Sequence, residues 1–204
     1  MSLLNLLEFH VSTNSLKRTE RYSSCPEVVR DSPADHSWGV GLLLCNLHRK
    51  GIVKDIDFEY AMNLALTHDL CECGKEQDFD SYLVATGVQS ETEKKKSETE
   101  VVQTLSQRFE MPEVLGMWKD YEKGRTKEAR VVKALDKIEA IIHIINVGGS
   151  HRKGVEDYDH IAKYADKSVM RCPELKPFLR IVKDRLKALY KEQGVEWKPD
   201  YDLV

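Results

Sequence analysis

Long apolar runs and a strong excess of one charge are both missing from this sequence of 204 residues. No stretch approaches the ~18 apolar residues that span a bilayer, and the first ten residues lack the basic region and cleavage site of a signal peptide. Thirty-one Lys and Arg stand against 34 Asp and Glu, a formal net charge of −3. A chain so near neutrality lacks the field that holds a nonspecific nucleic-acid binder to phosphates. We therefore expect a soluble, cytoplasmic protein with no membrane and no nucleic-acid polymer as partner. A small phosphorylated ligand, which needs only a local cluster of cations, stays open.

Cysteine is scarce, and its count is odd: the five are Cys25, Cys45, Cys71, Cys73 and Cys172. An odd number in this context favours free thiols in a reducing cytosol over a disulfide framework. Cys71 and Cys73 are only two positions apart, which is too weak a pattern for a zinc site.

Alternating apolar and polar runs long enough for a sheet are also lacking, so the sequence predicts an all-α fold. The length is that of a single domain, 1–204. Ser32 and Pro33 form a helix start, and Thr126 caps the clearest apolar periodicity. The predicted helices run from 33 to Gly51, from Asp57 to near Gly74, over 101–109, over 114–121, from 126 to Gly148 and over 175–190.

Three segments are less regular. Residues 75–97 are polar and carry no clear assignment, and their run Lys94-Lys95-Lys96 either faces a polyphosphate or is a solvated charge run. Residues 150–159 read as a polar loop. The aromatic tail from Gly194, with Trp197 and Tyr201, is expected to dock against the fold.

Ionisable residues in apolar helices are costly to bury unless they are paired or bind a metal. His68 and Asp69 end one such helix, His36 lies in the first turn of another, and Asp136 lies at the border of the strongest apolar face. Imidazole and carboxylate together suit Mn, Fe, Co or Zn. Taken singly, each residue also has an ordinary explanation, such as a hydrogen-bonded histidine or an Asp136 paired with a neighbouring lysine. Glu139 and His143 share the flank of Asp136.

The joint order H…HD…D resembles the HD superfamily of metal-dependent phosphohydrolases, and the flanks resemble its 5′-deoxynucleotidases. The matching pieces lie within residues 14–146 and are LKRTERY (16–22), SPADHS (32–37), LALTHDLCEC (64–73) and EARVVKALDK (128–137). This resemblance implies an HD-domain helical bundle with the metal site at the centre of converging helices. Residues 150–204 are then a C-terminal helical extension without a recognised motif.

The resemblance also implies roles for single residues. His36, His68, Asp69 and Asp136 would hold one divalent transition metal (Mn, Co, Fe or Zn), which activates water and polarises a phosphoryl group. Glu72, expected on the same helix as Asp69, matches the family's catalytic glutamate.

Arg21 and Tyr22 match an Arg-Trp pair that binds phosphate and packs on deoxyribose, and Arg18 is a second candidate for substrate binding. Tyrosine in place of tryptophan keeps an aromatic wall against the sugar but alters its width. The family's second carboxylate would fall at Gln77, so Asp78 is the candidate to replace it, with Asp80 close by.

The function that the resemblance implies is metal-dependent hydrolysis of deoxynucleoside 5′-monophosphates, in a homodimer or higher homo-oligomer. Two alternatives remain. One is a deoxynucleoside triphosphate triphosphohydrolase, as in small viral HD proteins. The other is a non-catalytic nucleotide-binding HD protein, which would typically have lost a ligand.

Overall fold

The computed structural model describes residues 2–22, 31–148 and 158–202. Helices dominate these residues, and the sole β pairing among them is an isolated parallel bridge between Glu20 and Gln77. The all-α prediction is therefore confirmed. The elements in chain order are α1 (Leu3–Thr13), η1 (Asn14–Lys17), α2 (Pro33–Arg49), α3 (Phe58–Thr67), η2 (Leu70–Glu72), α4 (Ser81–Ala85), α5 (Glu91–Arg108), α6 (Pro112–Lys123), α7 (Lys127–Asn146), α8 (Tyr158–Lys163), α9 (Asp166–Val169), η3 (Pro173–Leu175), α10 (Lys176–Glu192) and η4 (Pro199–Asp202).

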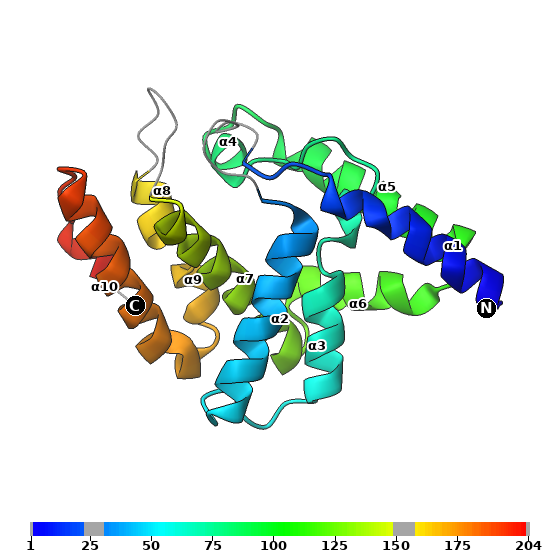
Figure 1. Cartoon of the computed structure of the whole chain (residues 1–204), viewed down its shortest axis with the longest axis horizontal. Helices are drawn as coiled ribbons and strands as arrows, with labels where there is room; N and C mark the ends of the chain where they lie inside the picture. The colour runs from blue at the N-terminus through cyan, green and yellow to red at the C-terminus, as the bar shows by residue number, and fades with distance from the viewer. Residues whose placement is uncertain (1, 23–30, 149–157, 203–204) are drawn as a thin grey trace.

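The centre of the fold is a group of three mutually packed helices, α2, α3 and α7 (Figure 1). Each begins at a side-chain cap that the sequence predicts. Ser32 accepts from the backbone N–H of Asp35, Asp57 from Tyr60 and Thr126 from Ala129. These bonds satisfy N–H groups that have no partner within a helix. The three helices enclose an apolar core that includes Leu44, Leu64, Leu135 and Ile138.

Two helix boundaries differ from the sequence prediction. The helix from Asp57 ends at Thr67 and not near Gly74, because the chain tightens into the 3₁₀ turn η2 directly after His68 and Asp69. Glu72 therefore lies on a separate turn and not on the same helix as the residues before it. In the unassigned stretch, α5 already begins at Glu91, one residue after its cap Ser90.

The C-terminal residues add a further layer, because α10 and α9 both pack on α7. Figure 1 shows α8 and α10 at one end of the molecule and α1 at the other. The tail docks as predicted: Tyr201 is buried, and the ring of Trp197 lies between those of Tyr190 and Tyr201, 5.6 and 5.0 Å away. Of the polar loop predicted over 150–159, residues 150–157 lie outside the described residues.

Two remaining sequence predictions concern membranes and thiols. Among the described helices, none is long and apolar enough to cross a membrane. Cys45, Cys71, Cys73 and Cys172 are free thiols, as predicted, and Cys25 lies outside the described residues.

Candidate metal centre and its cavity

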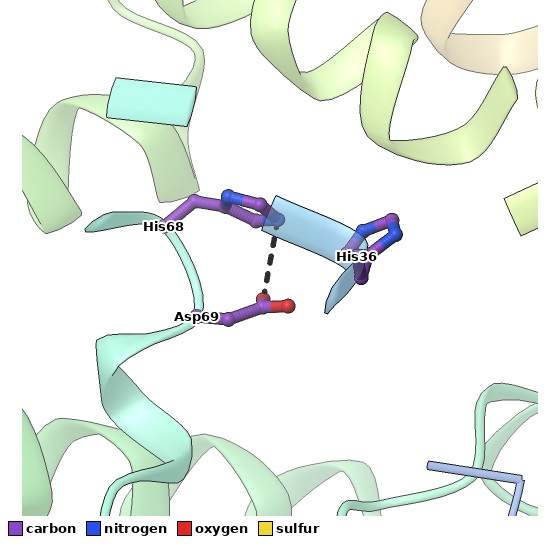
Figure 2. A group of neighbouring side chains, drawn as sticks. All are labelled: His36, His68 and Asp69. Atoms are coloured by element: carbon purple, nitrogen blue, oxygen red, sulfur yellow. Dashed lines mark ion pairs between the residues drawn. The ribbon is translucent and has the colours of Figure 1, made fainter. Parts of the chain in front are cut away.

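Three of the proposed metal ligands converge at the centre of the fold (Figure 2). His36 comes from the first turn of α2, and His68 and Asp69 follow the end of α3. Their ligand atoms all lie within 4.8 Å of one another. Asp136 of α7 joins them, with its Oδ1 3.0 Å from His36 Nε2. The structure thus brings together all four residues of the H…HD…D pattern from three separate places in the chain.

Both histidines are held by the ring nitrogen on the side away from the cluster. His68 Nδ1 lies 2.9 Å from the carbonyl oxygen of Ala65, which fixes this nitrogen as the donor. His36 Nδ1 is hydrogen-bonded to the carboxylate of Glu139. In each ring, Nε2 is therefore the nitrogen that faces the other ligands. A metal-binding histidine is typically fixed through its second nitrogen in this way.

Burial and charge govern protonation in this cluster. Burial lowers the pKa of His68, which keeps its imidazole neutral, the form that binds metals. For Asp136, burial alone would raise the pKa, but Lys137 and His36 outweigh it and hold the pKa well below its usual range. Burial and Arg21 would lower the pKa of His36, yet its hydrogen bonds to Asp136 and Glu139 raise it.

The cluster fits a divalent metal. His68 Nε2 is fully buried and has no hydrogen-bond partner; because Nδ1 carries the proton, Nε2 faces Asp69 Oδ1 at 3.4 Å as one acceptor beside another, an arrangement that is costly unless a cation binds there. Two imidazoles and two carboxylates form a donor set suited to a transition metal. Around Asp136, the ammonium of Lys137 (3.1 Å from Oδ2) and the hydroxyl of Tyr121 now supply the compensating positive charge and hydrogen bond.

A cavity of about 270 Å³ opens beside the cluster. His68, Asp69 and Asp136 line it, and so do Arg21 and Tyr22. The structure thus brings both members of the Arg-Tyr pair to the site. Arg18 lies elsewhere: it is exposed and lines a separate surface hollow, so its predicted role in binding has no support from its position.

Arg21 and Tyr22 are fixed by their neighbours. Arg21 forms an ion pair of 3.3 Å with Asp31, and its guanidinium lies 5.4 Å from the centre of the Tyr22 ring. Tyr22 has a φ of 56°, a left-handed conformation that is uncommon for a residue other than glycine. Its ring stacks on that of His143 at 5.4 Å. Such a backbone conformation is retained only where the surroundings determine it.

Glu72 also lines the cavity, from η2. It is almost fully buried, and its Oε2 has no hydrogen-bond partner. Burial, together with the carboxylates of Asp69 and Asp78, raises the pKa of Glu72 well above its usual range. A carboxyl group that keeps its proton near neutral pH is suited to act as a general acid.

The loop after Glu72 turns Asp78 toward the cavity and Gln77 away from it. Gln77 forms the bridge with Glu20 and is exposed in the separate hollow, whereas Asp78 lines the cavity and its Oδ1 has no hydrogen-bond partner. Asp80 lines the cavity as well, but its side chain caps α4. Position thus favours Asp78 as the second carboxylate.

The lysine run divides between the two roles considered from the sequence. Lys94 of α5 lines the cavity, 3.6 Å from Glu98, whereas Lys95 and Lys96 are exposed outside it. Sequence reasoning missed the cavity positions of Lys133 and Lys137, which it treated only as neighbours of Asp136. The available signal was that these two lysines lie four residues apart on α7, and therefore on one face, with the proposed ligand Asp136 between them in the sequence.

Comparisons with known proteins agree with this geometry. The family model described as HD domain matches residues 13–175. The chain belongs to the HD-domain family. It is 30% identical over 144 residues to the 5′-deoxynucleotidase HDDC2 of Dictyostelium discoideum, an alignment that covers 68% of this chain and 75% of that relative. For the protein of the same name from Danio rerio, the identity is 28%, covering 68% and 67%.

Solved structures show the same fold. A "predicted metal-dependent phosphohydrolase" from Magnetospirillum magnetotacticum superposes with a TM-score of 0.73 at 20% identity, covering 96% of each chain. A protein from Pyrococcus horikoshii gives a TM-score of 0.69 at 24% identity, covering 88% of this chain and 99% of that one. Family and relatives together make this HD domain an enzyme of the HD phosphohydrolase type, and they support a divalent metal as its cofactor.

Proposed function

We propose that the protein hydrolyses deoxynucleoside 5′-monophosphates to deoxynucleoside and inorganic phosphate, using one divalent transition metal. One observation carries the proposal: three of the four proposed ligands, His68, Asp69 and Asp136, line a single cavity together with Arg21 and with Glu72, whose raised pKa favours the protonated form. The relatives named 5′-deoxynucleotidase support the choice of substrate.

His36, His68, Asp69 and Asp136 would hold the metal. When bound, it lowers the pKa of a water molecule and polarises the phosphoryl group. Arg21 donates two parallel hydrogen bonds to phosphate oxygens, for which its planar guanidinium is suited.

In the hydrolytic step, a water oxygen forms a bond to phosphorus and the bond from phosphorus to the 5′-oxygen breaks. Glu72 gives its proton to that departing oxygen, because it retains a proton in its buried position. Asp78, with an oxygen free of hydrogen bonds, accepts the proton that the attacking water loses.

Tyr22 forms the wall against the sugar. Its ring is backed by His143, so the wall is rigid even though it is narrower than an indole. We expect deoxyribose to fit against this ring with less strict exclusion of a 2′-hydroxyl than a tryptophan would impose.

The decisive assay uses metal-stripped protein with Mn²⁺ or Co²⁺ added back, incubated with all deoxynucleoside mono- and triphosphates, with product separation by chromatography. Phosphate release from monophosphates that requires metal and is lost in His68→Ala is the expected result. The absence of any product across the panel would disprove the proposal while leaving the family assignment in place.

Triphosphohydrolysis of a deoxynucleoside triphosphate is the second candidate, and one observation favours it. Lys94 extends the cationic surface of the cavity on the side of α5, where additional phosphate groups would find a partner. Release of inorganic triphosphate in the same assay would identify this reaction. A non-catalytic binding role is less well supported, because all four proposed ligands and Glu72 are present.

We also propose a homodimer in the cytoplasm. Leu3, Leu4, Leu7 and Val11 of α1 are all more than half exposed, an apolar surface suited to a second copy of the chain. Free thiols are typical of a reducing compartment. We expect light scattering to find the wild-type protein dimeric and the Leu4→Lys variant monomeric.

A further inference from the structure

The wall of the cavity changes in chemistry along α7. Its first part carries Asp136 and Lys137, both charged, and its later part carries Ala140, Ile141 and Ile144, all apolar. At 1.5 Å per residue, Asp136 and Ile144 are separated by about 12 Å along the helix axis. The cavity therefore has a polar end at the proposed metal and an apolar end beyond it.

α8 and the residue after it contribute two rings to the cavity wall, one helical turn apart. Tyr164, directly after α8, accepts a hydrogen bond of 3.0 Å from Lys137, which places it beside the polar end. His160 continues the aromatic wall, with its ring 5.1 Å from that of Tyr164. Both residues line the cavity.

α4 holds His160 from the other side. The ring of Tyr82 meets it edge-on at 5.8 Å, and Ser81 Oγ lies 3.3 Å from its Nε2. The same cavity is also lined by aliphatic side chains, and aromatic and aliphatic walls with a few fixed polar groups are typical of a small-molecule pocket. Flat heteroaromatic ligands stack on such rings.

We propose that His160, Tyr164 and Ile144 form the binding site for the nucleobase. This inference rests on the proposed function for its orientation: the phosphate lies at the polar end, with Arg21 and the metal, and the base lies between α7 and α8. The residues that recognise the base thus come in part from α8, outside the four sequence motifs that carry the phosphate chemistry.

The test measures each end of the cavity separately. Protein loaded with Mn²⁺ is titrated by calorimetry with the four deoxynucleosides, which lack phosphate, and with inorganic phosphate, which lacks a base. His160→Ala is expected to weaken binding of the best deoxynucleoside by at least about fivefold, the lower range for loss of one stacking ring. Its affinity for inorganic phosphate is expected to stay unchanged.

Two further variants keep the test interpretable. His160→Leu retains bulk but removes the aromatic face, and we expect it to show the same selective loss of deoxynucleoside binding. It replaces His160→Ala in the test if that variant fails to fold. His10→Ala, on the exposed surface of α1, is the matched control and should change neither affinity.

The inference is overturned if the wild type binds phosphate but no deoxynucleoside, or if His160→Ala weakens both ligands equally. If the wild type binds both ligands and loses only deoxynucleoside binding in His160→Ala, yet hydrolyses no monophosphate, the base site stands and the proposed reaction fails.

Discussion

Glu139 offers the sharpest test of the metal centre, because it does not line the cavity and its side chain is hydrogen-bonded to His36. Its carboxylate is hydrogen-bonded to Nδ1 of a ring that is only 1% exposed. Loss of such a supporting partner typically lowers metal affinity by about 10- to 100-fold, or about 1.4 to 2.8 kcal/mol. We expect Glu139→Gln to fall near the lower value, since the amide oxygen still accepts the bond, and Glu139→Ala near the upper one.

A second substitution tests the same contact from the opposite helix. A Cβ atom at Gly39 would lie 2.5 Å from Glu139 Oε1, so Gly39→Ala must displace the carboxylate from its present position beside His36. We expect this variant to lose metal affinity as Glu139→Ala does, although it removes no polar group.

The assay is a calorimetric titration of metal-stripped protein with Mn²⁺, with circular dichroism to verify the fold. Glu122→Gln is the matched control: it makes the same chemical change as Glu139→Gln, but Glu122 pairs with Lys133 and with no histidine. Equal affinities in Glu139→Ala, Glu122→Gln and the wild type would refute the argument that Glu139 orients His36.

Two other substitutions test the roles of single charged residues in the cavity, Glu72 and Lys137. Glu72→Gln should reduce turnover by about 10²- to 10⁴-fold yet stabilise the metal-free fold. Because the pKa of Glu72 is raised in the folded state, the wild type loses stability as pH rises above its unfolded value near 4.5, and the glutamine variant does not. Its advantage in thermal melts should thus grow as the pH rises above the unfolded value near 4.5, until the folded-state pKa is passed; a constant difference would contradict this explanation. Lys137→Met removes the cation that neutralises Asp136. Mn²⁺ should then bind more tightly and inorganic phosphate about tenfold more weakly, and a parallel loss of both affinities would point to a structural role alone.

The central helices and the proposed ligands could be predicted because their signals are local. Capping residues mark the starts of α2, α3 and α7, and the ligands stand out as ionisable groups in apolar surroundings. The end of α3 could not be predicted, since no glycine or proline separates Thr67 from Glu72. A tight 3₁₀ turn and a continuing helix differ there only through tertiary packing.

Other features depend on contacts between distant segments. The first half of α5 has no apolar period, so nothing in the sequence distinguished Lys94, which lines the cavity, from Lys95 and Lys96, which are exposed outside it. Glu139 was visible on the flank of α7, but its partner in α2 was not. The approach of α8 to α7 is likewise a tertiary contact, and no local sequence pattern at His160 or Tyr164 predicts it.

Asp136 and Ile144 lie on one uninterrupted helix, α7. The protein should therefore be sensitive to insertions and deletions between them, which point substitutions do not test. Inserting a single residue between them would turn Ile144 by about 100° away from the cavity while Asp136 stayed in place. Relatives of this chain should therefore vary in the side chains that follow Asp136 but keep their number constant. Differences in substrate length should be accommodated in α8 and α4, which carry no proposed metal ligand.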